Sequence, residues 1–202
     1  MTMQPQASLC LRLSQVAVGQ LCSLFHMGVG IKTFAGTPLT ALLCDQLGIA
    51  MSYIEERVQT VFINYRAVDR LDAIIIQPSM IIALSAAMPG LAGATLRKGG
   101  MLAGFREGIS HDPKSSTPVD GEEETIITLK LFNQVAEDLT PHLLEVGIWV
   151  QGRILQEALL HSELVAEIEE DSIQWNAKHL TIAQFKEILW PADWILLQVT
   201  SR

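Results

Sequence analysis

Apolar residues follow two different spacings in the first half of the chain, and these spacings predict strands and one helix. Leu9, Leu11 and Leu13 alternate with more polar residues, which is the two-residue period of a strand with one wet face. A second apolar stretch, Val29–Phe34, follows a glycine-containing turn. We expect both segments to be strands with one face in a core.

Residues 38–47 predict an amphipathic helix. Thr37 is a good N-cap, and Pro38 suits the first helical position, where its missing N–H costs nothing. Four leucines then share one helical face: Leu39, Leu42, Leu43 and Leu47. Gly48 can take the left-handed conformation that ends a helix.

Stretches rich in β-branched and aromatic residues follow this helix. Residues 58–65 (VQTVFINY) and residues 80–84 predict strands, and Pro78 interrupts the apolar stretch 74–76 before the second of them. One helix across one face of a mixed four- or five-stranded sheet would bury these segments together. We therefore expect an α+β unit in residues 1–110.

This order of elements resembles the β-grasp, or ubiquitin-like, fold, and within it the sulfur-carrier proteins of molybdopterin and thiamine synthesis. The likeness covers residues 29–90 and rests on four features: Ala35-Gly36-Thr37-Pro38-Leu39 as the turn into the helix, Gln46-Leu47-Gly48-Ile49 as its exit, Val61-Phe62-Ile63-Asn64 with Val68 as the next strand and turn, and residues 81–89 as the last strand. It implies a β-grasp-like N-terminal unit, a mixed sheet with one packed helix. The carriers end in Gly-Gly, whereas Gly99-Gly100 is internal here and Tyr65 stands where the turn usually has glycine. The resemblance therefore implies a fold and does not imply sulfur transfer.

The second half of the chain predicts a mainly helical unit with short strands. Four residues share the spacing of one helix face: Leu129, Phe132, Ala136 and Leu139. Thr140-Pro141 predicts the start of another helix, which Gly147 would end. Residues 148–150 predict a short strand, and residues 154–159 carry a further helical stripe.

The end of the chain predicts one more helix and a final strand. Thr181 would cap this helix and Pro191 would end it. Three apolar residues of the helix would face the core: Phe185, Ile188 and Leu189. Residues 194–199 predict the final strand, which we expect to pair with residues 173–175.

A change in charge separates the two halves of the chain. Residues 1–110 carry eight Lys and Arg against six Asp and Glu, whereas residues 111–202 carry six against sixteen. Between them, residues 111–124 (HDPKSSTPVDGEEE) hold little apolar surface that could repay the entropy of ordering. We therefore predict two domains, residues 1–110 and 125–202, joined by an acidic loop or linker at 111–124.

One uncharged segment invites a membrane interpretation. Residues 73–96 carry no charge over 24 positions, a length that would span a bilayer. Pro78 and Pro89 break the segment into pieces shorter than a span. We expect buried strand and loop there, with membrane association as the alternative.

The composition argues against several function classes. The 202 residues carry a net charge of −8, whereas nucleic-acid phosphates need a basic surface. Three cysteines (Cys10, Cys22, Cys44) are too few for a disulfide framework, and the chain starts without a positively charged leader, so we expect a cytoplasmic protein. The histidines are isolated and neither HExxH nor CxxC occurs, so we expect no metal, no cofactor and no catalytic set.

The segment 89–109 holds six glycines in 21 residues. The interpretation we favour is a glycine-rich hairpin and surface loop. The other interpretation is an anion-binding site, in which backbone amides and basic side chains hold the ligand. Its candidate residues are Arg97, Lys98, Gly99, Gly100 and Arg106.

Two functions from different classes follow from these observations. The first is a non-enzymatic accessory or protein-interaction protein, in which a protein partner or a second copy of the chain covers the apolar residues 81–96. The alternative is a small-molecule (anion) binding protein or an enzyme, with its site at the glycine-rich loop 89–109 between the two units. The sequence favours the first and leaves enzymatic activity open.

Overall fold

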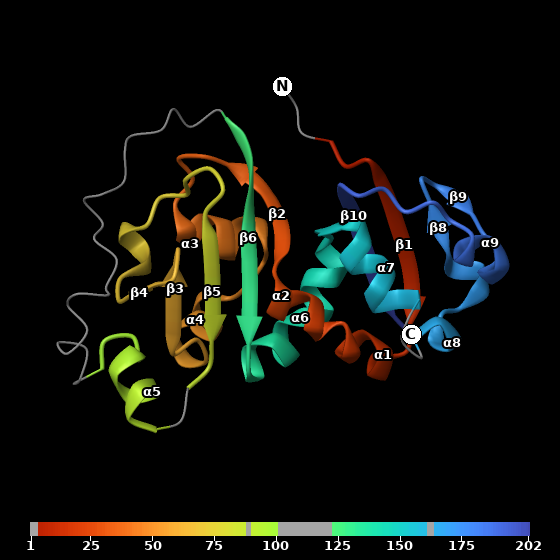
Figure 1. Ribbon diagram of the computed structural model, residues 1–202. Coiled ribbons are helices and arrows are strands. Elements are labelled where there is room, and N and C mark those ends of the chain that lie inside the picture. The colour runs from red at the N-terminus through yellow and green to blue at the C-terminus, as the bar shows by residue number, and fades with distance from the viewer. Residues whose placement is uncertain (1–3, 88–89, 101–122, 161–163) are drawn as a thin grey trace. The chain divides into compact units, whose positions relative to one another are not determined.

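The computed structural model describes residues 4–87, 90–100, 123–160 and 164–202 (Figure 1). The chain has a mixed α and β structure, as expected. It divides into two compact units, which we call unit 1 (Ile31–Ala136) and unit 2 (Thr2–Gly30 with Glu137–Arg202). This division differs from the predicted one, because the beginning of the chain folds with its end.

Unit 1 contains a mixed sheet in the order β4-β3-β5-β6-β2. Its strands are β2 (Val29–Phe34), of which Val29 and Gly30 belong to unit 2, and β3 (Thr60–Ile63), β4 (Arg66–Val68), β5 (Ile81–Ser85) and β6 (Glu124–Phe132). Strand β3 is antiparallel to β4 and β5, and β5 is parallel to β6. The strands predicted at 29–34, 58–65 and 80–84 are confirmed, the last two with shifted ends.

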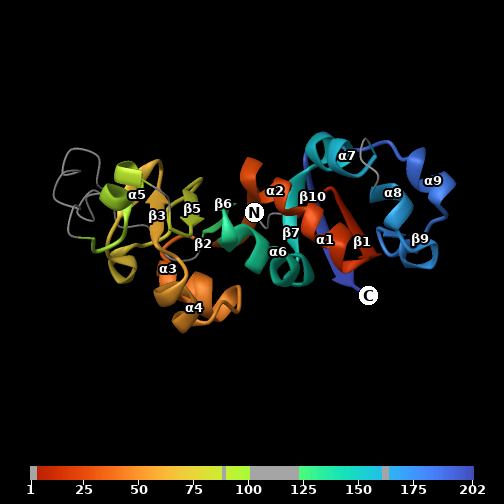
Figure 2. The same cartoon turned by 90° about the horizontal axis from the view of Figure 1, so that it is seen from below.

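One face of this sheet is covered by α3 (Leu39–Ala41), the π-helical turn η1 (Leu42–Gln46) and α4 (Met51–Glu56) (Figures 1 and 2). The predicted helix at 38–47 is confirmed: its four leucines are at most 2 % exposed, and Gly48 follows with a φ of 67°. Its predicted cap is wrong, because Pro38 is extended and no side chain caps the helix. The backbone around Thr37 instead pairs with residues 74–76, and the Ile76 N–H donates to the Thr37 carbonyl at 2.8 Å.

The long strand β6 stands where a helix face was expected. Leu129 and Phe132 have helical spacing, but the buried residues alternate along the strand: Thr125, Ile127, Leu129 and Leu131. The two-residue period holds because β6 lies between β5 and β2, where every second side chain reaches the core. Phe132 consequently faces the other side of the sheet and is 36 % exposed.

The helix α6 (Gln134–Val146) follows directly and corrects a second expectation. Thr140-Pro141 does not begin a helix, because Pro141 lies inside α6. Proline cannot donate the usual backbone hydrogen bond. Buried residues on both sides of it, Leu139 and Leu143, keep the helix packed through this position.

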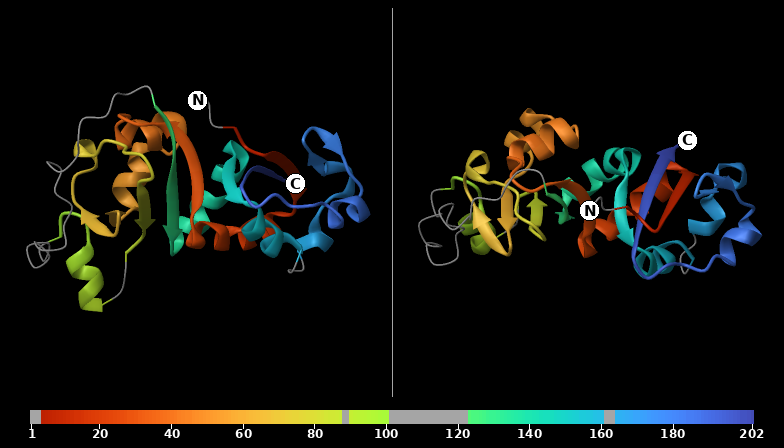
Figure 3. Two further views of the ribbon diagram at one scale, coloured as in Figure 1. Left: turned by 45° about the horizontal axis from the view of Figure 1, so that its top comes forward. Right: turned by 90° about the horizontal axis from the view of Figure 1, so that it is seen from above.

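In unit 2 the strand order is β7-β10-β1-β8-β9, with both parallel and antiparallel neighbours. Its strands are β1 (Ala7–Leu13), β7 (Ile148–Gln151), β8 (Gln174–Trp175), β9 (Lys178–His179) and β10 (Trp194–Ser201). The two ends of the chain pair in parallel, from Ala7 opposite Ile195 to Leu13 opposite Ser201 (Figure 3). The expected strands at 9–13, 148–150 and 194–199 are confirmed. The expected pairing of the last strand with residues 173–175 is wrong, because β1 lies between β10 and β8.

The helical elements of unit 2 are short. They are α1 (Gln15–Gln20), α2 (Cys22–Met27), α7 (Gly152–Leu160), α8 (Leu164–Glu167), η5 (Glu170–Ser172) and α9 (Ile182–Lys186). The cap at Thr181 is confirmed, and its hydroxyl accepts from the Gln184 N–H at 3.2 Å. Phe185 is fully buried as expected, but Leu189 is 94 % exposed, because α9 ends at Lys186 and the apolar spacing no longer applies.

Part of the chain is duplicated. Gln15-Val16-Ala17 at the start of α1 reappears as Gln134-Val135-Ala136 at the start of α6. Thirteen positions after each Gln stands a glycine with positive φ, 111° at Gly28 and 101° at Gly147. Each glycine N–H donates to the carbonyl four residues earlier, at 2.9 and 3.0 Å. Two positions further on, the equivalent residues Gly30 and Trp149 lie opposite each other in β2 and β7.

The duplication extends to a tight hairpin in each unit. Asn64-Tyr65 joins β3 to β4 and Asn176-Ala177 joins β8 to β9, and all four residues have positive φ. The chain therefore runs twice through strand, helix, strand, helices, hairpin and strand. The first strand of each copy, β1 or β6, belongs to the sheet formed by the other copy. This exchange explains why no single boundary in the sequence separates the units.

The glycine-rich segment differs from the hairpin that we favoured. Its described part begins with the helix α5 (Gly90–Leu96). Residues 101–109 and most of the predicted linker, residues 111–122, lie outside the described residues. In the described part of the chain, no helix is both long and apolar enough to cross a membrane.

Gly152 provides a stability test of unit 2. A Cβ at this position would lie 1.8 Å from the Pro191 carbonyl oxygen, which is backbone and cannot rotate away. We expect Gly152→Ala to lower the free energy of unfolding by about 3 kcal/mol, as an overpacked site does. Denaturant titration measures this change.

Gly19 in α1 is the matched control, since a Cβ there would meet nothing within 4 Å. Gly19→Ala should raise the free energy of unfolding by about 0.5–1 kcal/mol, because alanine is the better helix former. Equal effects of the two substitutions would contradict the packing described here.

Candidate functional site

The face of the unit 1 sheet that points away from α3 and α4 carries a row of side chains in register. Phe62 of β3 lies opposite Ala83 of β5, and Ala83 lies opposite Lys130 of β6. The neighbouring residues Val61 and Ile63 are buried on the helix side. Because side chains alternate along a strand, this row faces outward. We call this surface the open face of unit 1.

An apolar cleft of about 240 Å³ lies on the open face of unit 1. Six residues line it: Phe62, Tyr65, Ile81, Ala83, Lys130 and Phe132. Three are aromatic and one is a cation. The small Ala83 side chain lies between Phe62 and Lys130 and leaves the hollow. The cleft can receive an apolar side chain and place an anionic group near Lys130.

Tyr65 is the residue of this cleft that the fold least explains. It is 75 % exposed and has a φ of 67°, a region that bulky residues rarely adopt. The turn itself is held by Asn64, whose Oδ1 accepts from the Ile81 N–H at 2.9 Å. Strained residues that the surrounding structure maintains often lie at functional sites. An exposed aromatic ring in a position suited to glycine therefore marks the open face of unit 1 as a candidate site.

The corresponding face of unit 2 is polar. Four side chains form a row across its strands in register: Gln198, Cys10, Gln174 and His179. They lie along a cavity of about 560 Å³ that also contains Arg12, and the Cys10 Sγ is 3.9 Å from the Gln198 Oε1. Phe62 and Gln174 occupy equivalent places, two residues before the hairpin asparagine. The apolar character is therefore specific to unit 1.

The predicted anion-binding residues form hydrogen bonds with other residues of unit 1. The Arg97 Nε donates to the Gln59 Oε1 at 2.6 Å, and the Lys98 backbone N–H donates to the Gln59 carbonyl at 2.7 Å. The Gly100 N–H donates to the Arg97 carbonyl at 3.1 Å. Arg106 lies outside the described residues. The structure thus brings four of the five residues together beside the start of β3.

The Asp69 carboxylate accepts a hydrogen bond from one backbone amide of this turn. The Gly99 N–H donates to the Asp69 Oδ1 at 2.8 Å, and the Lys98 Nζ donates to the Ile54 carbonyl in α4 at 3.2 Å. Burial lowers the pKa of Lys98 below its usual value of 10.5, although the charge of Glu55 acts in the opposite direction. An external anion at this turn would have to compete with Asp69. Anion binding by these residues stays a prediction.

The cysteines are free and half-buried. Burial, followed by the charge of Asp45, raises the pKa of the Cys44 thiol and disfavours its reactive thiolate. Cys22 lies in α2, where its neighbours Leu24 and Phe25 are buried, in agreement with a core helix. Among the described residues, no three His, Cys, Asp or Glu side chains are grouped to hold a metal ion.

The cleft residues were not among the predicted site residues, although one of them carried a sequence signal. A tight turn after Asn64 favours glycine, and Tyr65 departs from that preference. Phe132 and Lys130 gave no signal, because they lay in a segment predicted as helix. No family model, no curated protein and no solved structure matches the chain.

Asp69 provides a test of the glycine-rich turn. Asp69→Ala removes the acceptor of the Gly99 N–H, so we expect the free energy of unfolding to fall by about 1 kcal/mol. The exposed amide can then bind phosphate. Phosphate at constant ionic strength should raise the Tm of this variant and leave that of the wild type unchanged.

Asp72→Ala is the control, since Asp72 pairs with Arg70 rather than with the turn. A phosphate-dependent rise of the wild-type Tm that is lost in Arg97→Glu and Lys98→Glu would instead support the anion-binding function.

Proposed function

We propose that this chain is a non-enzymatic accessory or interaction protein that binds a protein partner or a second copy of the chain through the open face of unit 1. The apolar cleft with the exposed Tyr65 carries the proposal. Aromatic side chains are enriched among the residues that contribute most to protein binding, and here three of them border one hollow. Lys130 adds a preference for a partner with an anionic group next to its apolar anchor.

The size of the cleft favours a protein over a small molecule. Its volume of about 240 Å³ is smaller than the roughly 300–1,000 Å³ typical of ligand pockets. It accommodates one apolar side chain of a partner, whose remaining contacts would spread over the sheet face. A second copy of the chain or a different protein can supply that side chain.

The fold of unit 1 supports a β-grasp-like arrangement as part of this proposal. Its mixed sheet has a central parallel pair, β5 and β6, and helical elements cover one face. The resemblance in the sequence covered residues 29–90, and β6 supplies a strand from beyond that range. In such an arrangement the sheet face opposite α3 and α4, on which the cleft lies, can receive a partner.

Tyr65→Gly separates stability from binding. Glycine adopts positive φ without the Cβ strain, so we expect the free energy of unfolding to rise by about 1 kcal/mol. Ala177→Gly, at the equivalent turn with a φ of 62°, should stabilise similarly. Chemical denaturation measures the stability of both variants. Only Tyr65→Gly should also weaken association of the chain with a second copy, which sedimentation velocity measures. Loss of association in both variants, or in neither, would contradict the role of Tyr65.

A photo-crosslinking amino acid at position 65 tests the partner directly. We expect conjugates in cells, with a second copy or another protein, that disappear when Ala83→Arg fills the cleft. The control position is 189, because Leu189 is 94 % exposed and lies outside the cleft. Sedimentation velocity of the purified chain over a wide concentration range identifies self-association.

The proposal fails if the chain sediments as a monomer at every concentration and position 65 yields no more conjugates than position 189. It also fails if Ala83→Arg leaves the conjugates unchanged while the protein remains folded by circular dichroism.

A further inference from the structure

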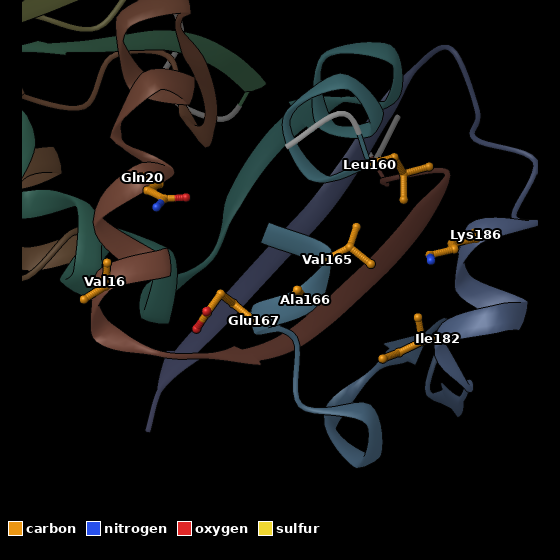
Figure 4. Close-up of a pocket in the computed structure, with 8 residues that line it drawn as sticks. All are labelled: Val16, Gln20, Leu160, Val165, Ala166, Glu167, Ile182 and Lys186. Atoms are coloured by element: carbon orange, nitrogen blue, oxygen red, sulfur yellow. The ribbon is translucent and has the colours of Figure 1, made fainter. Parts of the chain in front are cut away.

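A larger cavity lies within unit 2, apart from the open face of unit 1. Its volume is about 690 Å³, and α1, the end of α7, α8 and α9 contribute its walls (Figure 4). Most of the lining side chains are apolar: Val16, Leu160, Val165, Ala166 and Ile182. This volume falls within the range of about 300–1,000 Å³ found for small-molecule sites.

The two charged residues of the cavity differ in their partners. The Glu167 Oε2 accepts from the Ser14 hydroxyl at 2.8 Å and lies 3.9 Å from the Arg202 Nη2. Lys186 makes no ion pair with any residue that the structure describes. Figure 4 shows the Lys186 Nζ directed toward Val165, whereas the Glu167 carboxylate extends toward α1. The cavity thus has an apolar wall beside a lysine that has no counter-ion among the described residues.

Val16 gives a second, independent reason to expect an occupant. It is 75 % exposed, although Ala17 and Val18 next to it are buried. In the duplicated copy, the equivalent Val135 is fully buried. The packing of α1 leaves this apolar side chain in solvent at the rim of the cavity, where a ligand can cover it.

We propose that this cavity binds a free monocarboxylate with an apolar chain of medium length. Its carboxylate accepts hydrogen bonds from the Lys186 Nζ, and its chain lies over Val165 and Leu160 toward Val16. Glu167 sets the orientation of the ligand, because its negative charge would repel a ligand carboxylate placed beside it. The uncharged apolar chain of the ligand is not repelled there. A ligand with a cationic head would face Lys186 or would have to displace Arg202 from Glu167.

Isothermal titration calorimetry with octanoate tests the site on the whole chain. The expected result is saturable binding of one equivalent by the wild type. Lys186→Glu should weaken the affinity about tenfold or more, because an attractive charge contact becomes repulsive. Octylamine, which has the same chain and the opposite charge, should bind the wild type more weakly than octanoate.

Two further variants keep the test independent of folding. Lys178→Glu makes the same change of charge in unit 2 at an exposed lysine of β9 outside the cavity, and it should leave octanoate affinity unchanged. Val16→Asp changes an exposed side chain at the rim, so it should preserve the Tm and weaken octanoate binding. The inference is overturned if the wild type gives no saturable binding. Equal affinities in Lys186→Glu and Lys178→Glu, or equal binding of octylamine and octanoate, would overturn it as well.

Discussion

The parallel pairing of β1 with β10 is the interaction on which unit 2 depends. It joins residues as far apart as Cys10 and Gln198, which are separated by 188 positions. Closing so long a loop costs entropy, and burial must offset that cost. Leu9, Leu11 and Leu13 contribute to the offset, since each is at most 3 % exposed. Strand β6 has the corresponding role in unit 1, where it lies parallel to β5. Neither copy of the duplicated sequence therefore completes a sheet from its own strands.

The duplication also allows features shared by both copies, which the fold requires, to be distinguished from features found in one unit only. Equivalent hairpins carry Phe62 and Tyr65 in unit 1 but Gln174 and Ala177 in unit 2, and the adjacent faces are apolar and polar respectively. The same comparison sets Val16 in α1 against the buried Val135 in α6. Tyr65 and Val16 are each 75 % exposed, although the equivalent Ala177 is small and the equivalent Val135 is buried. Those differences support an interaction face in unit 1 and a ligand cavity in unit 2.

Local patterns predicted the local structure well. The alternation at Leu9 and Leu11, the leucine stripe after Pro38 and the cap at Thr181 each depend on neighbours a few residues away. The segment around Leu129 was mistaken because its spacing fits a helix and a strand equally over four residues, and only the pairing with β5 and β2 decides between them. The predicted domain boundary at residues 111–124 differs from the observed division, because it was placed from charge and composition. The exchange of strands between the copies does not change the composition. The cavity near Lys186 draws its walls from four helices, so no spacing along the chain could have indicated it.

Hydrogen–deuterium exchange of the Leu11→Asp variant tests the strand exchange most directly. A buried, unpaired carboxylate in β1 destabilises the sheet to which β1 belongs. The account predicts that amides of β10 and β7, at the opposite end of the sequence, lose protection while those of β3 and β5 keep it. Unchanged protection in β10, or equal loss of protection in β3 and β5, would contradict the exchange of strands between the two copies.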